Sequence, residues 1–109
     1  MEFLKHLPEE PKALASLVEI RKNRVVSMSL SQSDCCQMMV MAVSQGEEVT
    51  SEEYPGDTIY YVLEGCMPLH RNGTTYTMQA GEIAAVPRGV PHAIGGAGDF
   101  KILQIIVTR

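Results

Sequence analysis

The chain has 109 residues, which is enough for one hydrophobic core but too short for two domains of ordinary size. Hydrophobic residues make up 45% of the sequence and charged residues 20%, so the chain is predicted to fold rather than to remain disordered. The net charge is −4 and the Lys and Arg residues are scattered, which argues against a nucleic-acid partner.

The N-terminal stretch has no basic segment followed by an apolar region, and no later apolar run is long enough to cross a bilayer. We therefore expect a cytoplasmic protein with no membrane partner. The three cysteines, Cys35, Cys36 and Cys66, lack metal-binding spacing and are odd in number, which fits a reducing compartment. We expect them to be small buried side chains.

The beginning of the chain differs from the rest. Pro8 and Pro11 precede a stretch, residues 13–18, in which apolar residues recur at helical spacing. This pattern predicts a short helical or irregular segment. We place an N-terminal arm at residues 1–16 and one barrel domain at residues 17–109.

After this arm the apolar period changes to two. Val26, Met28 and Leu30 alternate with serines, which predicts a half-buried strand. Residues 37–43 are apolar on both parities, so a strand there must be covered on both faces, by a second layer or by a partner subunit.

Turn signals follow at short intervals after Gly46, and Asn72-Gly73 is a strong two-residue hairpin signal. Short strands punctuated by Gly and Pro indicate an all-β sandwich or barrel. The strands expected between these turns are residues 58–63, 74–78, 83–86 and 100–107.

Two segments resemble the sequence signatures of the cupin superfamily. The second signature, in which glycine, proline, glycine and histidine stand at fixed spacing, is matched by Gly81, Pro87, Gly89 and His92. Residues 60–65, Tyr-Tyr-Val-Leu-Glu-Gly, resemble the end of the first signature, which begins at Gly46. The resemblance implies a cupin double-stranded β-helix, which is a jelly-roll barrel with few exposed edges.

In cupins that bind metal, the first signature supplies two histidines and a glutamate, and the second supplies a further histidine. Counted from Gly46, these positions hold Glu52, Tyr54 and Thr58 here, and only His92 is kept. Such a donor set predicts weak or no metal binding. If a divalent transition metal is bound as cofactor, His92 and Glu52 are its candidate ligands.

The same positions are predicted to line a ligand site. Strand alternation places Thr58, Tyr60 and Val62 inward and Tyr61 outward. A carboxylate inside a barrel needs a partner, so Glu52 is expected to meet His92 and to form an acid–base pair of candidate catalytic residues. The predicted ligand-binding residues are Glu52, Tyr54, Thr58, Tyr60 and His92.

Three neighbouring positions receive other predictions. Met67 and Leu69 are better placed to face the core, so His70 is expected to point outward or toward a partner. Asp57 follows Pro55-Gly56 in a turn, where an Asp usually bonds nearby backbone amides.

These observations leave three functions open. The first is a binding module for a small organic molecule, neutral or cationic, that enters the barrel. The second is an enzyme of isomerase, epimerase or oxygenase type, which would use the pair of Glu52 and His92 or a weakly held divalent metal. The third is an assembly role in which residues 38–43 and 103–107 form an interface, and a homodimer is expected in any case.

Overall fold

The computed structural model describes residues 3–51 and 54–108. Strands dominate this part of the protein, and the only helical element described is a short 3-10 helix, η1 (Leu14–Leu17). The strands are β1 (Val25–Gln32), β2 (Cys36–Val43), β3 (Glu48–Ser51), β4 (Asp57–Arg71), β5 (Thr74–Gln79), β6 (Ile83–Val86), β7 (His92–Gly95) and β8 (Phe100–Val107).

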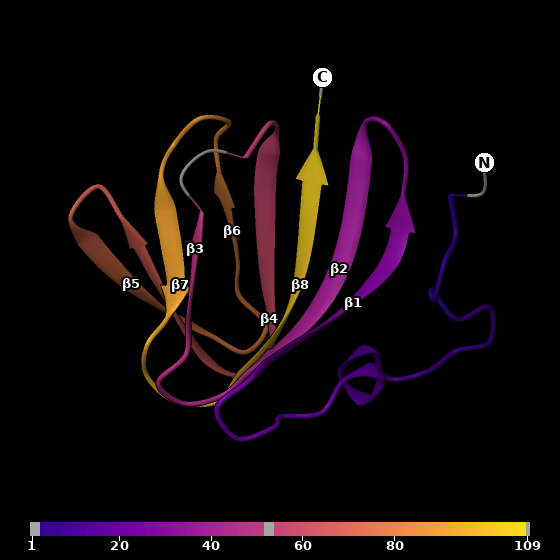
Figure 1. Ribbon diagram of the computed structural model, residues 1–109, viewed down its shortest axis with the longest axis horizontal. Coiled ribbons are helices and arrows are strands. Elements are labelled where there is room, and N and C mark those ends of the chain that lie inside the picture. The colour runs from indigo at the N-terminus through magenta and orange to yellow at the C-terminus, as the bar shows by residue number, and fades with distance from the viewer. Residues whose placement is uncertain (1–2, 52–53, 109) are drawn as a thin grey trace.

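The strands form one curled antiparallel sheet, shaped as a half-barrel that opens upward in Figure 1. Along the main path the strand order is β1-β2-β8-β4-β7-β3, and both β5 and β6 pair with β4. The first part of β4 pairs with β8 and β6, and its last residues pair with β7 and β5. The long strand β4 therefore joins the two walls of the half-barrel.

A bulge in β4 changes which residues face the interior. The register of β4 against β8 shifts between Val62 and Glu64. Before the bulge Thr58, Tyr60 and Val62 are buried, whereas after it the buried residues are Met67 and Leu69. Even-numbered side chains point inward before the bulge and odd-numbered ones after it, because the extra residue reverses the alternation. The inward orientation predicted for all five of these residues is confirmed.

The turn between β4 and β5 is also confirmed. Asn72 and Gly73 have φ angles of 53° and 77°, and positive φ at both central residues is what a tight two-residue hairpin requires. The strands expected at residues 58–63, 74–78, 83–86 and 100–107 are all present, although β4 continues to Arg71. The strands β3 and β7, of four residues each, were not predicted separately.

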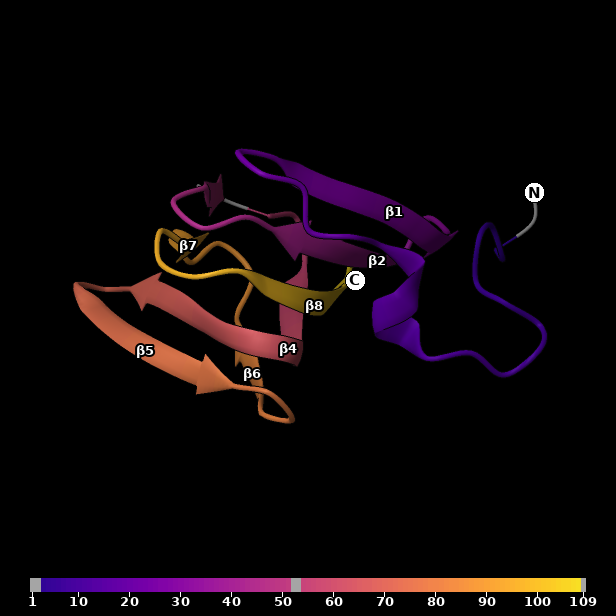
Figure 2. The ribbon, with the colours of Figure 1, turned by 90° about the horizontal axis from the view of Figure 1, so that it is seen from below.

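The doubly apolar strand β2 is covered on both faces by the chain itself. Met41 and Val43 belong to the core inside the half-barrel. Val40 and Ala42 belong to a second cluster on the outer face, which the N-terminal segment completes with Leu7, Leu14, Leu17, Val18 and Ile20. Figure 2 shows this segment beside β1 and β2, on the side away from β5 and β7. The second layer expected over β2 is therefore the N-terminal segment.

The expectation that the cysteines are buried is wrong. Cys35 and Cys66 are exposed, and Cys36 is half-buried. Cys35 lies in the hairpin between β1 and β2, and Cys66 lies on the outer face of β4 because the neighbouring Met67 points inward. Separately, no helix in residues 3–51 and 54–108 is long and apolar enough to cross a membrane.

Candidate functional site

Three polar side chains from three different strands meet inside the half-barrel. Tyr60 lies on β4, His92 begins β7, and Gln104 lies in the middle of β8. The Tyr60 hydroxyl lies 2.7 Å from Nε2 of His92, and Nε2 of Gln104 lies 3.3 Å from the same hydroxyl. We call these three residues the hydrogen-bond relay.

The direction of the hydrogen bonds in the relay follows from its ends. Nδ1 of His92 lies 3.0 Å from the carbonyl oxygen of Val90, and a carbonyl can only accept, so Nδ1 carries the proton. In the neutral imidazole Nε2 is then an acceptor, and the Tyr60 hydroxyl donates to it. The Gln104 amide donates to the Tyr60 oxygen. Each member of the relay is thereby held in one orientation.

The relay is almost fully removed from solvent. The exposed fractions of Tyr60, His92 and Gln104 are 1%, 7% and 4%. Burial raises the pKa of the Tyr60 phenol far above its usual range, because the phenolate would lose its hydration. Tyr60 therefore remains a neutral hydrogen-bond donor at every physiological pH.

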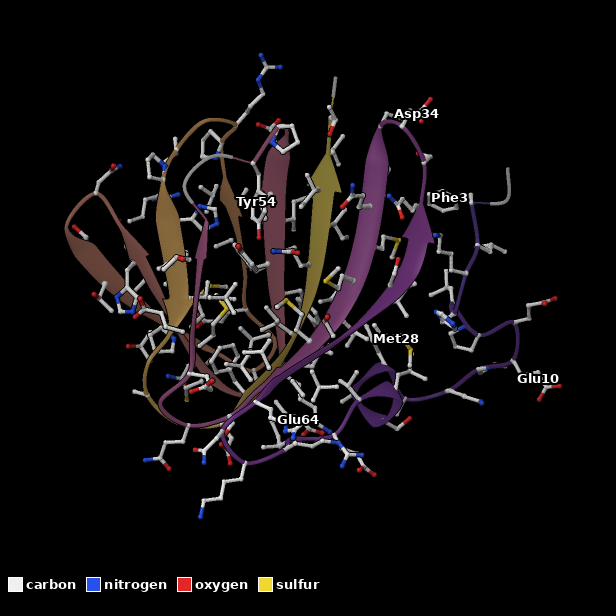
Figure 3. All side chains as sticks on the ribbon, viewed as in Figure 1. Phe3, Glu10, Met28, Asp34, Tyr54 and Glu64 are labelled. Carbon is white, nitrogen blue, oxygen red and sulfur yellow. The ribbon has the colours of Figure 1, made fainter. Side chains whose placement is uncertain are left out.

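Of the five residues predicted to line a ligand site, the structure brings three together. The ring of His92 makes edge contacts with Tyr60 and Tyr54, with centroid separations of 5.5 and 5.8 Å. Figure 3 shows Tyr54 within the outline of the half-barrel, between β3 and β4 in this view. Thr58 is buried on the inward face of β4, two residues before Tyr60. Glu52 lies outside the described residues, and the described partner of Nε2 of His92 is Tyr60.

The prediction missed Gln104, which donates to both phenols, with a distance of 3.5 Å to the Tyr54 hydroxyl. A signal for it was present in the sequence. Ile102 and Ile106 are buried on the inward face of β8, and Gln104 stands between them at strand period. A polar residue at such a position needs a hydrogen-bonding partner in the interior.

A cavity of about 340 Å³ opens between β5 and β6, and its lining does not include the relay residues themselves. Ala84 of β6, the direct neighbour of Tyr60 across the strands, lines this cavity. The cavity wall therefore lies one strand away from Tyr60 of the relay. Its lining is mainly apolar but also holds an arginine and a glutamate; the lining residues are Leu69, Arg71, Tyr76, Thr77, Met78, Glu82, Ile83 and Ala84.

The described residues do not fit a first-row divalent metal. No group of three or more His, Cys, Asp or Glu side chains occurs in residues 3–51 and 54–108. Of the four positions that hold metal ligands in metal-binding cupins, His92 has both ring nitrogens engaged, by Tyr60 and by the Val90 carbonyl. Tyr54 and Thr58 offer only neutral hydroxyls, which are poor ligands for such an ion.

Two nearby polar residues lie outside the site. His70 lies half-buried on the opposite face of β4, where Nε2 lies 3.0 Å from the carbonyl oxygen of Gly95 and Nδ1 lies 2.8 Å from the Thr75 hydroxyl. Its outward orientation agrees with the prediction. Asp57, the first residue of β4, accepts a hydrogen bond of 2.9 Å from the backbone amide of Arg88. It bonds a backbone amide as expected, but the amide is 31 positions away rather than in the turn before the strand.

Comparison with known proteins gives a consistent result. The cupin domain family model matches residues 39–108. The crystal structure of a cupin superfamily protein from Desulfitobacterium hafniense is 42% identical, with a TM-score of 0.91 over 97% of this chain and 98% of that chain. A cupin 2 conserved barrel domain protein from Leptotrichia buccalis is 31% identical, with a TM-score of 0.84 over 87% of this chain and 46% of that chain. No curated protein matches the chain.

A protein of unknown function from Streptococcus pyogenes has a TM-score of 0.93 at 24% identity, over 100% of this chain and 96% of that chain. At this identity the likeness concerns the fold alone.

Proposed function

Because the chain belongs to the cupin domain family, we propose that its half-barrel binds a small organic ligand in the interior, beside Tyr54, Tyr60 and His92. The observation that carries this proposal is the convergence of polar groups in an otherwise apolar interior. Small-molecule sites are usually concave and mainly apolar, with a few fixed polar groups that orient the ligand.

The relay provides these fixed polar groups. Gln104, Tyr60 and His92 hold one another at hydrogen-bonding distance, so their orientation costs no further ordering when a ligand arrives. Tyr54 is only half-buried, and its bond to Gln104 is the longest of the cluster at 3.5 Å. A ligand hydroxyl or carbonyl can take the place of this weak contact with little loss.

The cavity provides the room. Its volume of about 340 Å³ lies at the lower end of the range found for small-molecule sites. The inward side chains Leu69, Met78 and Ala84 give it an apolar wall. A ligand of the size of a substituted benzene ring fits these dimensions.

Both ring nitrogens of His92 are engaged, by the Tyr60 hydroxyl and by the Val90 carbonyl, so the imidazole would have to break one of these bonds to exchange a proton with a substrate. The neutral Tyr60, whose pKa is raised by burial, is itself a weak acid–base group near pH 7. Ligand binding without turnover is therefore the function that we propose.

The test uses benzamide, a neutral ring of the right size, and a pair of matched variants. Ala84 faces the cavity, whereas Ala85 is exposed on the same strand, so Ala84→Leu fills the cavity and Ala85→Leu does not. We expect benzamide to shift the NMR signals of His92 and of the cavity wall in the wild-type protein and in Ala85→Leu, and not in Ala84→Leu. Equal shifts in both variants, or none in the wild type, would count against an interior site.

Assembly as a homodimer is a second, separate proposal. The predicted interface at residues 38–43 and 103–107 is partly occupied, because Val40 and Ala42 are fully buried beneath the N-terminal segment and Leu103 packs against the same cluster. Apolar surface remains farther along the outer face, where Tyr61 and its cross-strand partner Ile83 are 37% and 66% exposed. This pair supports an interface on β4 and β6.

A further inference from the structure

Arg71 points into the half-barrel, beside the proposed ligand site. It lies directly opposite His92 in the pairing of β4 with β7, and residues directly opposite each other project from the same face of a sheet. It also shares the inward parity of Met67 and Leu69, which are fully buried. Arg71 and the relay residue His92 are therefore neighbours on the interior surface.

The guanidinium of Arg71 is held in place. Nη1 donates a hydrogen bond of 3.0 Å to the carbonyl oxygen of Ala85 on β6. Its central carbon, Cζ, lies 5.5 Å from the centre of the Tyr76 ring on β5, which is within the range of a cation–π contact. The side chain thus reaches from β4 across to β5 and β6, at the cavity between them.

Most of the hydrogen-bonding capacity of Arg71 is left over. A guanidinium has five N–H donors, and among residues 3–51 and 54–108 only the Ala85 carbonyl accepts from it. The ion pairs found in this part of the chain do not include Arg71. A fixed cation with unused donors that form a planar fork matches the geometry of a carboxylate.

Among the described residues, the one carboxylate that lines the same cavity is committed elsewhere. Oε1 of Glu82 accepts a hydrogen bond of 2.7 Å from the backbone amide of Gln79. It caps the turn between β5 and β6, and the ion pairs of the described residues do not join it to Arg71. Its negative charge still lies in the cavity, so it opposes an anionic ligand to some degree.

We propose that Arg71 is a carboxylate subsite, so that the ligand of the half-barrel is a small organic acid. This inference rests on the proposed binding function and specifies its ligand class. The apolar body of the acid would lie on Leu69, Met78 and Ala84, with its carboxylate on the guanidinium of Arg71. An anionic ligand thus replaces the neutral or cationic ligand expected from the sequence, because the inward-pointing Arg71 was not among the residues predicted to line the site.

The test compares benzoate with benzamide, which has nearly the same shape but no charge, by NMR titration of the full chain. We expect benzoate to bind the wild-type protein roughly tenfold more tightly than benzamide, as is typical of a charge-assisted hydrogen bond. Arg71→Gln is expected to abolish this preference, and Arg71→Lys to keep part of it, because lysine retains the charge but not the fork. Glu82→Gln is expected to strengthen benzoate binding.

Arg24→Gln is the matched control, because it removes the same charge from an exposed residue outside the cavity. Equal affinity for benzoate and benzamide, a preference that survives Arg71→Gln, or a preference that Arg24→Gln removes to the same extent would overturn the carboxylate subsite. In that case benzamide binding that is lost in Ala84→Leu still supports the proposed function. A titration with inorganic phosphate completes the test. If phosphate binds as tightly as benzoate and its binding depends on Arg71, the assignment to organic acids is overturned.

Discussion

Replacement of Tyr60 by phenylalanine tests the relay on which the candidate site is built. The substitution removes one hydroxyl and leaves the aromatic ring in the core. The hydroxyl donates to Nε2 of His92 at 2.7 Å and accepts from Nε2 of Gln104 at 3.3 Å. Both partners are buried, so neither can readily turn to water instead.

The expected loss of stability follows from what these partners retain. Gln104 keeps its longer contact with Tyr54 at 3.5 Å. Nε2 of His92 loses the donor that the structure shows, and a buried acceptor without a partner costs about 1–3 kcal/mol. We expect Tyr60→Phe to lower the free energy of unfolding by about 2 kcal/mol near neutral pH.

The same hydroxyl gives this difference a characteristic pH dependence. Burial raises the pKa of the Tyr60 phenol in the folded state, whereas in the unfolded chain the phenol ionises near its ordinary value of about 10. Above this pH the unfolded chain releases a proton that the folded protein retains, so the stability of the wild type falls by about 1.4 kcal/mol per pH unit. The Tyr60→Phe variant has no such proton to release.

Urea denaturation of both proteins at about pH 9 and about pH 11 measures the effect. The stability advantage of the wild type is expected to shrink by about 1.4 kcal/mol between these conditions. The other tyrosines are present in both proteins, so their ionisation cancels in the comparison. A stability difference that is the same at both pH values would refute the buried, neutral Tyr60 on which the relay depends.

Three further predictions follow from other parts of the structure. Gly65→Ala should lower the free energy of unfolding by roughly 3 kcal/mol or more, because a Cβ there would meet the backbone oxygen of Asp99. Gly73 also has a positive φ but lies in open space, so Gly73→Ala should lower the free energy of unfolding by only about 1 kcal/mol. Equal losses for the two variants in urea denaturation would contradict this. Ile83→Asp should shift the mass measured by light scattering from dimer to monomer, and a monomeric wild type would contradict the interface. Elemental analysis of protein purified without chelators should find far less than one transition-metal ion per chain, and a stoichiometric metal would contradict the donor set described.

Much of the fold could be predicted because its causes are local. The hairpin at Asn72-Gly73 depends on two adjacent residues that tolerate positive φ. The inward orientation of Tyr60 depends on strand alternation alone. The short strands β3 and β7 were harder to predict, because four residues are too few to establish a period of two.

The candidate site could be predicted only in part, because its residues are joined by contacts distant in sequence. Tyr60 and His92 are 32 positions apart, and Gln104 is 44 positions from Tyr60. Arg71 was missed for another reason. Side chains alternate along a strand, so the inward orientation predicted for Met67 and Leu69 also implies an inward orientation for Arg71, two residues later on β4. The prediction stopped at Leu69.

The relay and Arg71 contribute to binding in different ways, because they differ in how far their hydrogen bonds are already satisfied. A ligand that broke the 2.7 Å bond between Tyr60 and His92 would have to replace it, so the gain would be small. Arg71 breaks no hydrogen bond with the described residues when a ligand uses its remaining donors, and it gives up only the water that solvates this half-buried side chain. We therefore expect Arg71 and the apolar wall to supply most of the affinity, and the relay to fix the orientation of the ligand. Substitutions at Arg71 should accordingly change affinity more than substitutions at Tyr54.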